Sequence, residues 1–270
     1  MFQTRKTRLL AGWAAACVLV GAAPTAPCGP DWLPPGPVYP RSLADPREPR
    51  VGLQADFGGD RLDGALGLPI PLLGGNGNLA YAVNLEAGAF FVLGKDGAFF
   101  PLRTFDGLFG LSGEIARGPW HGKLRLFHVS AHKADGDTTV TYRGQTYSRE
   151  FAWFEIGRRM DRLFAYARAG FSWHAVPEDP GGDFALGAQW EPPPGSVGPY
   201  AAVHFSVDEE RNWRVNQSVL AGVALGHTNR LMLGLRYFNG NSFEGQYHSE
   251  PLRLFGFEVM FQPRYEVSSH

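Results

Sequence analysis

Residues 124–137 hold the side chains of this sequence with the clearest potential for chemistry. The stretch reads LRLFHVSAHKADGD and places His128, Ser130 and His132 at every second position. A serine beside a histidine base can act as a nucleophile, provided that a third group orients the histidine and that donors stabilise the oxyanion. The spacing therefore makes Ser130 a candidate catalytic nucleophile and His128 its candidate catalytic base.

The same stretch has two further interpretations. His132, Asp135 and Asp137 are candidate binding residues, but a structural zinc site needs four ligands, and KADGD lacks the spacing of a calcium loop. We therefore expect no metal site and no cofactor, with calcium considered only for a hydrolase. The simplest interpretation is a polar rim where a strand leaves the bilayer, because polar side chains cost little near that interface.

A strand must position these residues, because successive side chains of a strand point to opposite faces. The preceding residues divide into an apolar and a polar face: Trp120, Leu124 and Leu126 against His121, Lys123 and Arg125. His128, Ser130 and His132 continue the apolar series unless a bulge shifts the register. We therefore expect them on the outside of the sheet, at the level of lipid headgroups.

Similar alternation recurs along the chain and predicts an all-β fold. We count about twelve segments, an even number that suits a closed antiparallel bacterial barrel. They begin near residues 50, 61, 79, 106, 120, 149, 161, 183, 199, 215, 229 and 252. Connections after the even-numbered segments are mostly short, whereas several after the odd-numbered ones are long, as expected when the N-terminus is periplasmic.

A soluble β-sandwich also alternates, so the polar face has to distinguish the two folds. Small or charged residues occupy that face, as expected inside a closed barrel: Gly110, Ser112, Glu114, Gly187, Gln189, Arg236 and Glu258. Both charge signs occur there, and Glu86, Glu114 and Glu155 can pair with Lys123, Arg125, Arg168 or Arg236. We therefore predict a transmembrane barrel with a charge-paired lumen; a passive pore is less favoured, because ion selectivity uses rings of one sign.

The chain divides into three segments. Residues 1–22 resemble a secretory signal peptide, with Arg5, Lys6 and Arg8 before a short apolar run. Residues 23–49 form a proline-rich arm, expected in the periplasm, whose entry into the barrel stays open. Residues 50–270 form the barrel, which we assign to the bacterial outer membrane.

Cysteine content and charge restrict the partners. Cys28 is left without a partner once the signal peptide with Cys17 is removed, so no intrachain disulfide is predicted. A formal net charge of −1 gives no basic footprint for nucleic acid. The expected partners are outer-membrane lipids, lipopolysaccharide and, during insertion, the barrel-assembly machinery.

Four ordered motifs carry a family resemblance. VYPRSLADPREPRVG, RLFHVSAHKADGD, YSREFAWFEIGRR and YFNGNSFEGQYHSE resemble a bacterial family catalogued as domain of unknown function twelve-oh-seven. The resemblance covers nearly all of the mature chain and implies an outer-membrane barrel without an established activity. Ala131 stands where the family usually has a second serine.

The His–x–Ser pair is also similar to the arrangement in outer-membrane phospholipase A and the lipid A deacylases. That resemblance implies Ser130 as nucleophile and His128 as base. The phospholipase's orienting asparagine would fall near Tyr142, so Asp135, Asp137 or Glu150 would have to replace it. We predict a structural or small-molecule-binding barrel, with a lipid hydrolase as the alternative.

Overall fold

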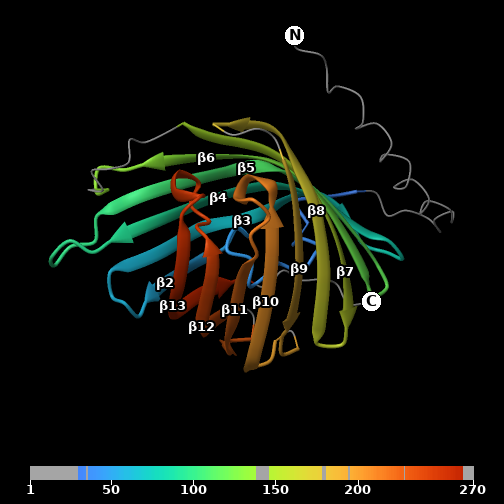
Figure 1. The fold of residues 1–270 in the computed structure, drawn as a ribbon. Coiled ribbons are helices and arrows are strands. Elements are labelled where there is room, and N and C mark those ends of the chain that lie inside the picture. Colours follow the sequence, from blue (N-terminus) through green and yellow to red (C-terminus); the bar gives the residue numbers. More distant parts are fainter. Residues whose placement is uncertain are drawn as a thin grey trace, which may run out of the picture.

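The computed structural model shows an antiparallel β-barrel over most of the chain after residue 29 (Figure 1). The signal-peptide prediction, Cys17 and Cys28 lie outside the described residues. Those residues are 30–34, 36–137, 146–177, 181–193, 195–227 and 229–263.

Twelve consecutive strands close the barrel in the described part of the chain, with β3 paired to β4 and β13 paired to β2. Each begins within four residues of its predicted start. The strands are β2 (Val51–Asp56), β3 (Arg61–Gly75), β4 (Ala80–Gly94), β5 (Leu102–Arg117), β6 (Trp120–Lys133), β7 (Tyr147–Met160), β8 (Leu163–Val176), β9 (Gly182–Trp190), β10 (Gly198–Asp208), β11 (Asn216–Leu225), β12 (Arg230–Asn241) and β13 (Pro251–Gln262). A further short strand, β1 (Asp31–Trp32), pairs with the end of β3.

The connections define two ends of the barrel. We call the end with the turns 76–79, 118–119, 161–162, 191–197 and 226–229 the short-turn end, and the opposite end the long-loop end. The 3₁₀ turns η1 (Glu209–Arg211) and η2 (Gly245–Tyr247) lie in connections at the long-loop end. Within the described residues, no helix has the length and apolar character needed to span a membrane.

The outer face of the wall is apolar and the inner face is polar, which is the reverse of a soluble β-sandwich. On β6, Leu124 and Leu126 are exposed on the outer face, whereas Lys123 and Arg125 are buried on the inner face. The same division holds around the ring, where exposed apolar side chains alternate with buried polar ones such as Asn84, Glu86, Ser112, Glu114, Gln189, Arg236 and Glu258. The sequence-based assignment of the two faces is therefore confirmed.

Two chain segments occupy the interior. Residues 36–50, which we call the lumenal arm, precede β2 and run inside the ring of strands (blue in Figure 1). Residues 242–250, which we call the closing loop, connect β12 to β13 and fold inward from the long-loop end. The arm predicted at 23–49 thus enters the barrel over its second half, the possibility that the sequence left open.

Candidate functional site: a charged lumen closed by two segments

Arg236 fastens the main chain of the lumenal arm to the wall. Its guanidinium donates to the carbonyl oxygens of Leu43 and Ala44, each at 2.9 Å. The same group donates to Glu258 at 2.5 Å and to Ser218 at 2.8 Å. An arginine has five N–H donors in a planar fork, so one side chain on β12 can fix two successive peptides of the arm.

Two further wall residues form hydrogen bonds with the backbone of the lumenal arm. The side-chain amide of Gln189 donates to the carbonyl of Arg41 at 2.9 Å and accepts from the amide of Leu43 at 3.1 Å. Glu114 accepts from the amides of Val38 and Tyr39 at 2.7 and 2.9 Å. A proline-rich segment cannot satisfy its own backbone groups in a helix or central sheet, so wall side chains take that role.

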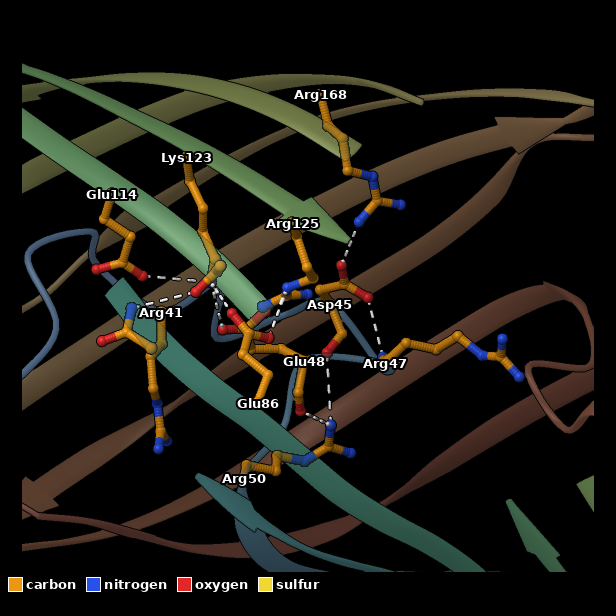
Figure 2. A network of polar contacts seen from close by, with 12 residues as sticks. Arg41, Asp45, Arg47, Glu48, Arg50, Glu86, Glu114, Lys123, Arg125 and Arg168 are labelled. Atoms are coloured by element: carbon orange, nitrogen blue, oxygen red, sulfur yellow. Dashed lines mark hydrogen bonds and ion pairs between the residues drawn. The ribbon is translucent and has the colours of Figure 1, made fainter. Parts of the chain in front are cut away.

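Charged side chains of the arm complete an ion-pair network with the wall (Figure 2). Glu48 accepts from Arg125 at 2.9 Å and lies 3.9 Å from the ammonium of Lys123. Glu86 lies 2.6 Å from Arg125 and 3.1 Å from Lys123. Lys123 is also 3.6 Å from Glu114. All these side chains are buried, so each charge depends on its neighbours for compensation.

Asp45 forms a second charged anchor. Its carboxylate accepts from Arg168 at 2.7 Å and lies 3.8 Å from Nε2 of His204. Burial alone would raise the pKa of Asp45, but the neighbouring His204 and Arg168, together with the amide of Arg47, hold it well below its usual value. Asp45 is therefore ionised inside the barrel.

The closing loop is anchored at the other end of the lumen. Asp106 on β5 accepts from the amide of Gly245 at 2.8 Å, and Gln246 donates to the carbonyl of Ala131 at 2.6 Å. Tyr247 donates to Asp137. The last residues of the loop contact η1, where His248 lies 3.4 Å from Glu210.

Arg47 connects the two segments. Its guanidinium donates to the carbonyl of Phe243 in the closing loop and to Asp106 of the wall, at distances from 2.6 to 3.2 Å. The cavities beside it are small. One of about 60 Å³ is lined by Arg47, Trp153, Asp183 and neighbouring residues, and one of about 20 Å³ is lined by Arg50, Asp63 and others.

The predicted pairing of the inner charges is confirmed for Glu86 and Glu114. Glu155 forms no ion pair with another described residue. Arg168 and Arg236 pair instead with Asp45 and Glu258, respectively. The sequence reasoning missed the arm carboxylates, Asp45 and Glu48, although their signal was available: two acids and three arginines are interspersed through RSLADPREPR, an unusual density for a solvated linker.

The candidate catalytic pair lies on the outer face of β6, as predicted. The register against β5 continues without a bulge through His128, Ser130 and His132. His128 Nδ1 is 3.8 Å from Glu150 Oε1, with both side chains well exposed, and Trp173 donates to Glu150 at 2.9 Å. Ser130 has no side-chain hydrogen bond to another described residue, so nucleophile and base are not joined.

The candidate binding residues are not brought together. Asp137 is held by Lys133 at 2.7 Å and by Tyr247, so it fastens the closing loop. Asp135 and His132 are exposed. No group of three or more His, Cys, Asp or Glu side chains suited to a metal ion occurs in the part of the chain that is described.

Comparison with solved structures returns two matches at low similarity. The β domain of the Bordetella autotransporter BrkA matches with a TM-score of 0.42 and 15% identity, covering 78% of this chain and 95% of that chain. The anion-selective porin from Comamonas acidovorans matches with a TM-score of 0.37 and 9% identity, covering 79% and 96%. No curated protein matches the sequence.

Comparison with family models returns a match at the C-terminal part of the barrel. The matched residues run from β9 to the end of β13 and include the closing loop, whereas the arm and the end of β6 lie outside them. Residues 184–262 match the family described as "Protein of unknown function (DUF1207)", in agreement with the resemblance that the sequence motifs carry.

Proposed function

We propose that this chain is an outer-membrane barrel protein whose lumen is kept closed by its own lumenal arm. The single observation that carries the proposal is the burial of residues 41–46 in the lumen, where Arg236, Gln189 and Arg168 bind them. A segment bound through its backbone and its charges is part of the folded barrel. The protein then acts as a closed structural barrel and not as a diffusion pore.

The outer surface supports a membrane location. Exposed leucine, isoleucine, valine and phenylalanine side chains occur on the outer face from β3 to β13. In water, contiguous apolar surface of this extent is a liability for a monomer. A bilayer removes that cost, because alternate residues of each strand face lipid and the remainder face the interior.

The cavity volumes favour a structural role over small-molecule binding. Binding pockets for small molecules usually measure roughly 300–1,000 Å³. The larger of the two cavities beside Arg47 measures about 60 Å³, a volume suited to a few water molecules. The lipid-hydrolase alternative receives no support from the geometry, because Ser130 lacks a hydrogen bond to His128 within the described residues.

The test compares three refolded chains in planar bilayers: the mature chain, a chain that begins at Arg50, and a chain that begins at Gly36. We expect ion conductance only from the chain that begins at Arg50, because it alone lacks residues 36–49 of the lumenal arm. The chain from Gly36 is the matched control, since it loses β1 but keeps every arm contact. Equal conductance from the mature chain and the Arg50 chain would contradict the proposal.

A further inference from the structure

Arginine side chains gather on the outer face at the short-turn end. Arg117 ends β5, Arg158 lies on β7, and the register places both opposite Trp120 on β6. Arg162 follows in the turn between β7 and β8. All three arginines are exposed, and Trp120 is 51% exposed.

These arginines have no acidic partner among the described residues. None of the three forms an ion pair there, although Arg230 at the same end lies 3.7 Å from Glu191. The guanidinium of Arg158 instead lies 5.3 Å from the centre of the Trp120 ring. The guanidinium groups at this edge of the barrel are therefore open to an external anion, in contrast to the buried arginines of the lumen.

The apolar outer surface begins directly beside this cluster. Ile115, Leu124 and Ile156 are exposed on the same face of the same three strands. An arginine at such a border can lay its aliphatic stem on apolar surface while the guanidinium reaches a polar layer. Tryptophan is likewise enriched at the interface between lipid and water.

We propose that Arg117, Arg158 and Arg162, together with Trp120, bind the phosphodiester headgroups of anionic phospholipids in the leaflet beside the short turns. The inference rests on the proposed membrane location. A guanidinium can donate two parallel hydrogen bonds to a phosphate, and the three guanidinium groups, from β5, β7 and the turn that follows β7, offer several such contacts. Because no described carboxylate pairs with these groups, the cluster is complementary to an anionic headgroup.

The test titrates the folded mature chain in detergent with phosphatidylglycerol, and separately with phosphatidylcholine, by native mass spectrometry. We expect tighter binding of phosphatidylglycerol. Each of R117Q, R158Q and R162Q should weaken it about fivefold, the equivalent of the roughly 1 kcal/mol that a surface arginine contributes toward anionic lipid. R253Q is the matched control, because Arg253 also lies near an aromatic ring, Tyr237, but at the long-loop end.

The two proposals fail in different ways. Insertion is followed by the heat-dependent gel mobility of each chain in phosphatidylcholine vesicles. If the wild-type chain does not insert, the membrane location is wrong, and the lipid site is wrong with it. If it inserts but binds both lipids equally, only the headgroup site is wrong. The same conclusion holds if R117Q, R158Q and R162Q all keep the wild-type affinity for phosphatidylglycerol, or if R253Q loses as much affinity as they do.

Discussion

The lumenal arm and the closing loop both fill the barrel, but they are held by different interactions. Arg168 and Arg125 bind buried carboxylates of the arm, and the buried guanidinium of Arg236 binds its main-chain carbonyls. The closing loop also has a charged anchor, the ion pair of Glu244 with Arg61 at 2.7 Å, but it depends further on hydrogen bonds such as those to Asp106 and from Gln246. Removing one member of a buried charge pair usually costs more than removing one neutral hydrogen bond.

The difference indicates a hierarchy of closure. The arm is bound to the inner face of the wall over residues 38–50. The closing loop covers only the long-loop end and contacts the arm through Arg47. We therefore expect the closing loop to loosen first and the arm to leave only when the barrel unfolds. Four changes would break or sharpen this comparison.

The largest effect is expected from R236M. The substitution removes four hydrogen bonds, two of them to the arm, and leaves the buried Glu258 with Arg50, at 3.2 Å, as its one remaining ion-pair partner among the described residues. We expect the free energy of unfolding to fall by about 3–5 kcal/mol, measured by urea titration in micelles. R253M, on the exposed outer face, should change it little. A loss as small as that control would mean that the charges do not fasten the arm.

A smaller effect is expected from D106N, because Asp106 contacts both the arm and the closing loop. The neutral side chain loses the ion pair to Arg47 and weakens the bond from the Gly245 amide. We expect a loss of about 1.5–3 kcal/mol, with hydrogen exchange rising more in the closing loop than in the arm. D135N provides the exposed control. Equal acceleration in both segments would remove the proposed hierarchy.

Acid should release the closing loop before the arm. Burial raises the pKa of Glu210, but Arg211, Arg149 and His248 outweigh it and lower the pKa. A lowered carboxyl pKa stabilises the folded state above the unfolded pKa, and this stabilisation is lost as the pH falls through the folded pKa. The pKa of Asp45 is lowered further, so the arm should persist to lower pH. Hydrogen exchange measured at decreasing pH, corrected for intrinsic rates, checks the order; E210Q should reduce the acid response of the loop around His248.

The smallest effects are expected on the outer face of β6. S130A and H128A remove partly exposed side chains that contact neither segment, so we expect changes within about 0.5 kcal/mol and unchanged conductance. The same variants test the sequence-based hydrolase hypothesis. Acyl release from phospholipid or lipid A by the wild-type chain, lost in both variants, would restore that hypothesis and show that the outer rim has a function of its own.

Much of the wall could be predicted from the sequence. The strand starts, the inner position of Arg236 and Glu258 and the outer position of Ser130 all follow from period-two alternation, and the structure agrees. The third neighbour of His128 could not be chosen among Asp135, Asp137 and Glu150. Only the pairing of β6 with β7 brings Glu150 to His128, because strand register depends on contacts between segments distant in sequence.

The sequence by itself determined that the chain forms a closed β-wall with an apolar outside and a polar inside, because alternation is a local property of each strand. Only the tertiary structure decided what fills that wall. The arm has no periodicity, and the density of its acids and arginines, although unusual for a linker, does not indicate which residues they pair with. The arginines that bind the arm, Arg125, Arg168 and Arg236, come from three separate strands. Such compensation exists only once the barrel has closed around the arm.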